Sequence, residues 1–284
     1  MKKKEGFMEN TKKTKSWDEL TFADNFMFCK ILESEPEICK RLLELLLHIE
    51  IDHLEAPSAE HTMQESPDSK SVRFDVYTKD KNRIFDLEMQ TTDTKNLPKR
   101  ARYYQNIIDM SSLNKGMNYS KLKDTYIIFL CLDDIFHEEL PVYFFENVCR
   151  ENHRIKLRDG TYKLFFNAKN CDKLKTAEER DFFRFLRGQS AESELSRRIE
   201  ERIKIAKKNL AWRNQYMTWQ QTIDEEKEIA YEEGERANKI ANAKNLLSMN
   251  IITPEQISMA IELPLEEVLA LKDEMSKEAA ALVK

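Results

Sequence analysis

Two short stretches in which apolar and polar residues strictly alternate constrain the fold of this chain most strongly. Alternation runs through residues 72–77 and again through residues 84–90, with the polar residues 79–82 between them. A period of two residues is typical of a strand with one buried face, and two such runs around a short polar break predict a β-hairpin. Its apolar face, which other elements must cover, consists of Phe74, Val76, Phe85, Leu87 and Met89.

The patterns around this hairpin predict helices and further strands in the same domain. Helical periodicity occupies residues 24–50, where Pro36 opens a second helix, and residues 95–113. The predicted fold class is therefore α/β. The remaining expectations are a loop over 55–71, a doubly buried strand over 126–132, and a second hairpin over 143–166 that turns at Asp159-Gly160.

Beyond about residue 175 the strand signals stop and the chain becomes helical and highly charged. Residues 253–256 (TPEQ) form a capping box with proline at the first helical position, and Pro264 opens the next helix. We expect four regions: a disordered tail over 1–15, an α/β domain over 16–175, a long charged helical segment over 176–235 and a small three-helix module over 236–284.

The C-terminal helices are too acidic for a DNA-reading helix-turn-helix. Residues 264–274 carry four Asp or Glu and a single Lys, which would repel phosphates. We interpret this module as a protein-interaction or self-association element, and we expect a homo-oligomer formed through it.

Composition excludes several classes of protein. Five glycines and 34% charged residues do not suit a many-turned β-sandwich, and a net charge of −5 excludes a globally basic surface. The longest apolar run is too short to span a membrane. The five cysteines include no C-x-x-C pair and the N-terminus resembles no secretory signal, so we expect a cytoplasmic protein with reduced thiols.

The hairpin also carries the candidate site. A two-residue turn at Lys81-Asn82 sets Asp75 directly opposite Glu88, with Cβ atoms about 5 Å apart. Facing carboxylates repel, and a cation such as Mg²⁺, which is typically held by one or two carboxylates, removes that repulsion. Strands also commonly carry charges toward solvent, so a solvated polar face is the alternative. Asp86 enlarges the acidic cluster or is itself solvated.

Several blocks of the sequence, taken in order, resemble a known family. Asp75 and Glu88 with Gln90 are similar to the PD-(D/E)XK nuclease signature, and flanking blocks extend the likeness over about residues 17–135 to the PD-(D/E)XK nuclease family of transposases, also called recombination-promoting nucleases. The matching blocks are 24–30 (DNFMFCK), 73–75 (RFD), 86–90 (DLEMQ), 100–104 (RARYY) and 116–122 (GMNYSKL).

The resemblance implies a nuclease core with a mixed central sheet flanked by helices, followed here by an α-helical region. Asp75 and Glu88 would bind Mg²⁺, or Mn²⁺ in its place, with the Met89 carbonyl as a further ligand. Gln90 stands where the wider superfamily has lysine; its amide can orient the attacking water but offers no charge. Asp24 matches a family position that could join the metal, although we favour a helix cap.

The residues after the hairpin form a basic patch in an acidic protein. Residues 91–125 contain seven Lys or Arg and three Asp, a net charge of +4, as expected beside DNA. The candidate phosphate contacts are Lys95, Lys99, Arg100 and Arg102.

The predicted function is therefore a Mg²⁺-dependent DNA endonuclease of the transposase or recombination-promoting type. The alternative is a catalytically inactive protein that keeps the nuclease fold and binds DNA or protein. Gln90 and the long charged helix favour this alternative, whereas retention of both Asp75 and Glu88 opposes it.

Overall fold

The computed structural model describes residues 15–64, 70–92 and 95–282, in two compact units that divide after Asn214. The tail expected over residues 1–15 lies outside the described residues except for Lys15. We describe each unit by itself.

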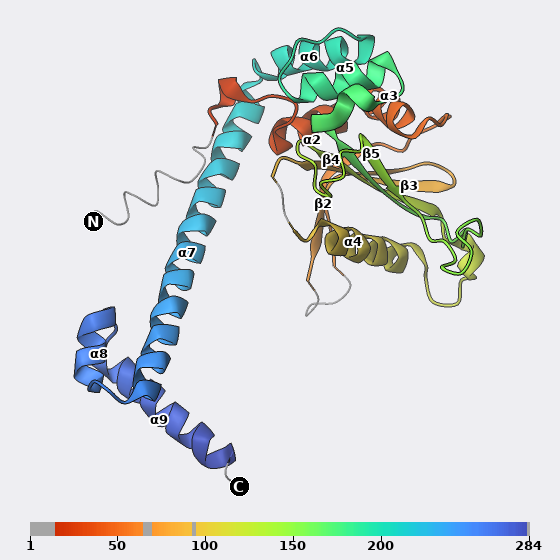
Figure 1. The fold of residues 1–284 in the computed structure, drawn as a ribbon. Coiled ribbons are helices and arrows are strands. Elements are labelled where there is room, and N and C mark those ends of the chain that lie inside the picture. Colours follow the sequence, from red (N-terminus) through yellow and green to blue (C-terminus); the bar gives the residue numbers. More distant parts are fainter. Residues whose placement is uncertain (1–14, 65–69, 93–94, 283–284) are drawn as a thin grey trace. The chain divides into compact units, whose positions relative to one another are not determined.

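The first unit is built on a mixed six-stranded sheet with the order β1-β2-β3-β4-β6-β5 (Figure 1). The pairs β1–β2, β2–β3 and β5–β6 are antiparallel, whereas β3–β4 and β4–β6 are parallel. This arrangement confirms the α/β class and the mixed sheet that the resemblance implied. The strands are β1 (Ser58–Met63), β2 (Val72–Lys79), β3 (Arg83–Gln90), β4 (Asp124–Cys131), β5 (Val142–Phe145) and β6 (Thr161–Asn167).

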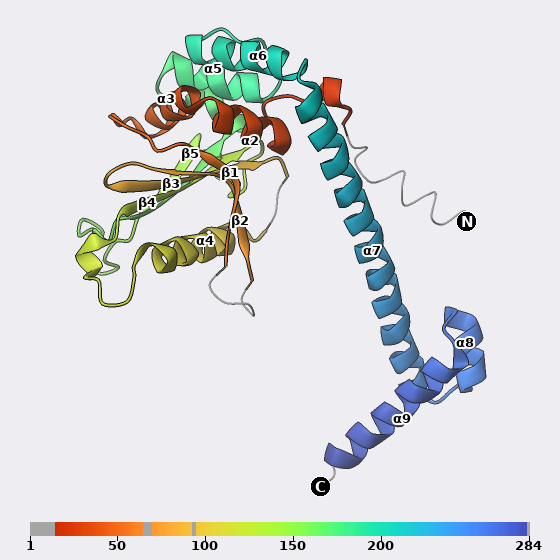
Figure 2. The same cartoon turned by 180° about the vertical axis from the view of Figure 1, so that it is seen from behind.

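Helices cover both faces of the sheet (Figures 1 and 2). One face carries α2 (Asn25–Ser34), α3 (Pro36–Leu47), α5 (Ala177–Leu186) and α6 (Glu194–Ala206), and the other carries α4 (Leu97–Ser112). Short 3-10 helices occupy Trp17–Glu19, Tyr119–Lys121 and Ala168–Lys173. Because both faces are covered, β3 and β4 run through the core. In β4 the last five residues, Ile127 to Cys131, are all buried. The doubly buried strand predicted over 126–132 is therefore confirmed.

The hairpin has the predicted register. Val76 pairs with Leu87 and Lys79 with Ile84, which leaves Lys81-Asn82 as the turn. Asp80 fixes this turn, because its Oδ1 accepts the backbone N–H groups of Asn82 and Arg83 at 2.8 and 2.7 Å.

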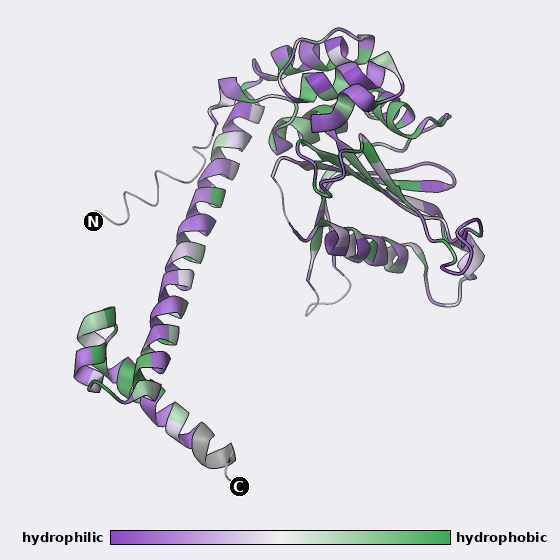
Figure 3. Ribbon diagram, viewed as in Figure 1, coloured by the Kyte–Doolittle hydropathy of each residue, from purple (hydrophilic) through white to green (hydrophobic). Residues whose placement is uncertain are grey.

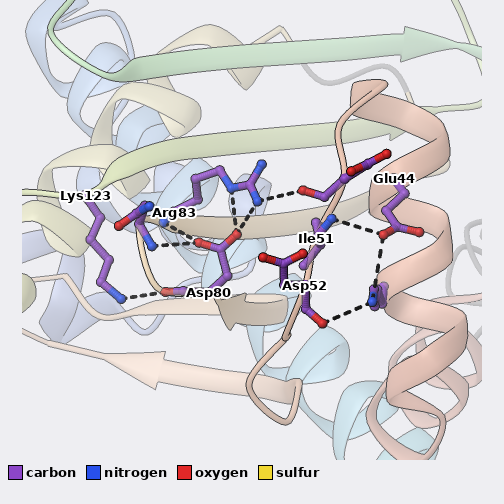
Figure 4. A network of polar contacts seen from close by, with 9 residues as sticks. Glu44, Ile51, Asp52, Asp80, Arg83 and Lys123 are labelled. Carbon is purple, nitrogen blue, oxygen red and sulfur yellow. Dashed lines mark hydrogen bonds and ion pairs between the residues drawn. The ribbon is translucent and has the colours of Figure 1, made fainter.

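A polar network anchors the same turn to its neighbours (Figure 4). The Arg83 guanidinium contacts Asp80 Oδ2 at 2.6 Å and donates to the Glu50 carbonyl at 3.0 Å, while Lys123 Nζ donates to the Asp80 carbonyl at 2.7 Å. Nearby, Glu44 accepts the Ile51 N–H at 3.1 Å, which holds the chain after α3. The hairpin is therefore held at its closed end by charged hydrogen bonds.

Three details differ from the sequence-based expectations. The loop expected over 55–71 contains β1, an edge strand that pairs with β2. The second hairpin exists, but its chain reverses near Asn152 rather than at Asp159-Gly160, since Cys149 N–H donates to the Ile155 carbonyl. The sequence predicts that Phe74 lies on the apolar face of the hairpin. Its ring instead packs against Tyr104 of α4, with 5.1 Å between the ring centroids, so the expectation is wrong for this residue.

The second unit contains the remainder of α7 (Leu210–Met249) with α8 (Pro254–Ile261) and α9 (Leu265–Leu282). The capping box at Thr253 is confirmed. Figure 3 shows mainly hydrophilic residues along α7 and hydrophobic ones where the three helices meet. This small core consists of Ala243, Ile257, Leu263 and Val268.

No helix among the described residues is long and apolar enough to cross a membrane. None of the five cysteines, all of them described, takes part in a disulfide bond.

Candidate active site

Asp75 and Glu88 lie where β2 and β3 separate. The paired ladder stops at Val76–Leu87, and beyond it the two carboxylates replace the missing backbone partners. Glu88 Oε1 accepts the Asp75 N–H at 2.9 Å, and Asp75 Oδ2 accepts the Met89 N–H at 3.0 Å. The structure thus brings together the two acids that the hairpin register predicted to face each other.

The polar side chains of β3 are buried. Asp86, Glu88 and Gln90 are 0%, 3% and 6% exposed, because α4 covers the face of the sheet from which they project. The alternative of a solvated polar face is therefore wrong, as is the suggestion that Asp86 is solvated. Burying ionised carboxylates without partners is costly, so such a cluster must be neutralised by protons or by cations.

Burial raises the pKa of all three acids. It raises the pKa of Glu88 to about 8, with a further increase from Asp75 and an opposing effect of Arg100. Burial also raises the pKa of Asp75, against the Met89 N–H and the Asn25 side chain, which favour its charged form. The pKa of Asp86 is raised well above its usual range by burial and by the neighbouring Glu88 and Asp75.

Asp86 has no donor to stabilise its charge. Neither of its carboxyl oxygens accepts a hydrogen bond from any described residue. A protonated Asp86 can instead donate a hydrogen bond to Glu88. This interaction raises the pKa of Asp86 and lowers the pKa of Glu88.

Arg100 enters the cluster from the first turns of α4. Its Nη2 lies 3.0 Å from Glu88 Oε2 and 3.2 Å from Gln90 Oε1. The guanidinium carbon is 4.9 Å from the Phe129 ring centroid and 5.6 Å from that of Tyr104. Arg100 therefore belongs to the acidic cluster, whereas the other predicted phosphate contacts, Lys95, Lys99 and Arg102, are exposed.

Gln90 is oriented by its own contacts. Its Oε1 accepts from Arg100, and its Nε2 donates to the Thr92 carbonyl and approaches the Thr92 hydroxyl at 3.4 Å. The amide therefore links α4 to the end of β3.

Asp24 lies outside this cluster. Its carboxylate accepts from the Thr21 N–H at 2.7 Å and from Lys15 Nζ at 2.8 Å. It occupies the N-cap position of α2, where its carbonyl accepts the Phe28 N–H at 3.0 Å, but its carboxylate makes no hydrogen bond to that helix, so the expected side-chain cap is absent.

The neighbouring residue Asn25 is a contact of Asp75 that sequence reasoning missed. Its side chain hydrogen-bonds Asp75, and one turn later Cys29 Sγ donates to the Asp75 carbonyl at 3.2 Å. The spacing of four residues places both side chains on one face of α2. That spacing within block 24–30 was the available signal.

The donor set fits a divalent cation. Among the described residues, no group of three His, Cys, Asp or Glu is arranged to hold a metal as it stands. Asp75 and Glu88 nevertheless lie together at the split of the hairpin, where the carboxylate of each accepts a backbone N–H of the other strand. The Met89 carbonyl points to the same side of β3 as Asp75, because the N–H and carbonyl of one strand residue point alike and the Met89 N–H donates to Asp75. Hard oxygen donors of this kind suit Mg²⁺ or Mn²⁺.

Comparison with known proteins adds one match. The family model described as PD-(D/E)XK nuclease family transposase covers residues 23–247, which is more than half of the chain. No curated protein and no solved structure matches the chain. The sheet, the divided hairpin and its buried acids agree with the family match, and the chain therefore belongs to the PD-(D/E)XK nuclease family transposases.

Proposed function

We propose that this protein is a metal-dependent DNA endonuclease that hydrolyses phosphodiester bonds in recombination or transposition. The observation that carries this proposal is the pair of acids, half-buried Asp75 and buried Glu88, fixed at the split of the β2–β3 hairpin. A pair whose pKa values are raised gains most from a divalent cation, since the cation replaces the protons that otherwise neutralise it.

Asp75, Glu88 and the Met89 carbonyl would hold the cation, for which Mg²⁺ is the first candidate and Mn²⁺ the substitute. When bound, such a cation lowers the pKa of water and neutralises charge on phosphate oxygens. The chain supplies the positioning: backbone amides hold both acids, and the Asn25 side chain holds Asp75. Because α4 covers this face of β3, the side chains of Asp86, Glu88 and Gln90 have little contact with solvent.

DNA is the proposed substrate because basic side chains surround the start of α4. Lys95, Lys99 and Arg102 are exposed there. Lys99 and Arg102 are three residues apart, so they lie side by side on the helix. Exposed lysine and arginine side chains make contacts to the phosphate backbone that position DNA without reading its sequence.

The proposal also includes self-association of the protein and its location in the cell. The second unit exposes apolar side chains beside its small core, among them Ile251 (79% exposed) and Met259 (83% exposed), so we place homo-oligomerisation on the C-terminal helices. Free thiols suit a reducing compartment, and we place the activity in the cytoplasm.

A second candidate function is binding without catalysis. The ion pair of Arg100 with Glu88 already neutralises one acid, and Gln90 carries no charge. Both features favour a protein that keeps the fold and binds DNA or another protein.

Nicking of supercoiled plasmid separates the two candidates. Wild type is expected to nick DNA in Mg²⁺ and not in EDTA. Asp75→Asn and Glu88→Gln keep the size of each side chain and should lower the rate by about a thousandfold or more. The matched control is Glu178→Gln, which removes a carboxylate of α5 that pairs with Arg41 of α3 at 2.6 Å. Equal rates in EDTA, or an active Glu88→Gln, would refute the metal-site proposal; DNA binding without cleavage in any divalent metal would establish the second candidate.

A further inference from the structure

Arg100 is held more firmly than a surface arginine. Its guanidinium contacts Glu88 and Gln90 through one nitrogen, Nη2, and lies against the rings of Phe129 and Tyr104. Aromatic faces and hydrogen-bond acceptors together fix the position of a long side chain that is otherwise flexible. The sequence of α4 therefore places a cation of defined position beside the two proposed metal ligands.

This cation acts on the whole acidic cluster. The positive charge of Arg100 lowers the pKa of Asp75, Asp86 and Glu88 alike, against the effect of burial. Arg73 also acts on Asp75, but it is about half exposed and lies 3.6 Å from Glu60.

Donor groups of Arg100 remain available. Both of its polar contacts use Nη2, and a third of the side chain is exposed. Its Nε lies buried without a hydrogen-bond partner among the described residues. A planar guanidinium presents several N–H groups in one fork, which matches the oxygens of a phosphate.

The contacts of Gln90 explain its role beside this cation. The carbonyl oxygen of the Gln90 side chain accepts from Arg100, and its amino group donates to the Thr92 carbonyl. The second hydrogen bond therefore orients the amide so that its oxygen holds the arginine. A lysine at position 90 would repel the guanidinium.

We propose that Arg100 is a catalytic residue that contacts the phosphate undergoing hydrolysis, and that Gln90 is the positioning residue that holds it. This inference rests on the proposed nuclease function. In the reaction the oxygen of water forms the new P–O bond while the bond from phosphorus to the leaving sugar oxygen breaks. One proton of that water passes to solvent and the leaving oxygen takes one up. Arg100 stabilises the charge on the phosphate and keeps its own protons.

The test uses three variants and one control in the full-length chain. Arg100→Gln removes the charge, Arg100→Lys keeps the charge without the fork, and the double variant Arg100→Gln with Gln90→Lys returns a charge from β3. The control is Arg184→Gln, which breaks an arginine–carboxylate pair with Asp172 (2.5 Å) on the surface of α5. Thermal unfolding confirms that each variant is folded.

Cleavage is measured in single turnover with saturating protein in Mg²⁺. Arg100→Gln should be slower by about a hundredfold to a thousandfold, as for loss of one donor to a transition-state oxyanion. Arg100→Lys should fall between it and wild type, the double variant should recover at least about tenfold, and the control should match wild type. Wild-type cleavage by Arg100→Gln, or no recovery in the double variant, would overturn the inference.

Mn²⁺ affinity separates catalysis from a purely structural role. If Arg100 acts on the phosphate, removal of its charge leaves Mn²⁺ binding as tight as in wild type or tighter. If Arg100 only holds Glu88 in place, Mn²⁺ affinity falls together with cleavage, which would overturn the inference.

Duplex binding in Ca²⁺ at one fixed salt concentration tests the phosphate contact without cleavage. Arg100→Gln should bind about tenfold more weakly, and the double variant should recover. If wild type cleaves in no divalent metal, the proposed function and the catalytic role of Arg100 both fail, and this measurement decides only the phosphate contact: a drop with recovery supports the contact, and an unchanged affinity refutes it.

Discussion

Replacing Glu88 by Gln should change how the stability of the metal-free protein depends on pH. Glutamine keeps an oxygen that can accept the Asp75 N–H, and it removes the charge that burial and Asp75 disfavour. Since the folded state raises the pKa of Glu88 from 4.5 to about 8, the folded protein holds a proton over this range that the unfolded chain has released. The free energy of unfolding therefore falls as pH rises through this window and levels off above it.

The magnitude follows from one retained proton. The slope attributable to Glu88 is at most about 1.4 kcal/mol per pH unit, and over the full interval the loss reaches at most about 5 kcal/mol. Glu88→Gln has no proton to release, so it should lose less stability than wild type, and near pH 8.5 it should be the more stable of the two by several kcal/mol.

Urea unfolding in EDTA at pH values from 5.5 to 8.5 measures this difference. Subtracting the two proteins cancels the titrating groups outside the acidic cluster, and Glu178→Gln shows what loss of a partly exposed carboxylate does by itself. A wild-type stability that runs parallel to that of Glu88→Gln across the range would refute the assignment of a raised pKa to Glu88.

Three further predictions concern the rest of the molecule. Gln90→Ala should slow cleavage by about tenfold to a hundredfold, because Arg100 loses one contact, with duplex affinity nearly unchanged; single-turnover rates and binding at one salt concentration check this. Asp80→Ala should lower the free energy of unfolding by about 3 kcal/mol, because the N–H groups of the turn and the Arg83 guanidinium lose the buried carboxylate that accepts from them, and an unchanged urea midpoint would contradict it. A chain that ends at residue 235 should keep the first unit and lose self-association; identical sedimentation of both lengths at every concentration would exclude the C-terminal helices as the contact.

Much of the hairpin could be predicted from the sequence because its signals are local. Alternation fixed both strands, and the polar pair Lys81-Asn82 fixed the register that brings Asp75 to Glu88. Burial of the polar face was not predictable in this way, because it depends on α4 folding back over β3. The edge strand β1 was missed for a similar reason: residues 58–63 are poor in β-branched and aromatic residues and become a strand by pairing with β2.

The position of Arg100 could have been found with a finer use of helical spacing. It lies three residues after Leu97 and four before Tyr104, so it belongs to the apolar stripe of α4 that faces the sheet. Arg102 lies off that stripe and is exposed. The basic patch therefore combines one inward arginine with side chains that face solvent, a distinction that net charge does not make.

The central claim is that Asp75 and Glu88 together hold a divalent metal, and titration with Mn²⁺ followed by electron paramagnetic resonance tests it most directly. Wild type should bind Mn²⁺ at a site that Mg²⁺ displaces, and binding should weaken by at least about tenfold in both Asp75→Asn and Glu88→Gln while Glu178→Gln stays like wild type. Mn²⁺ binding of equal strength in wild type and in these two variants would contradict the account.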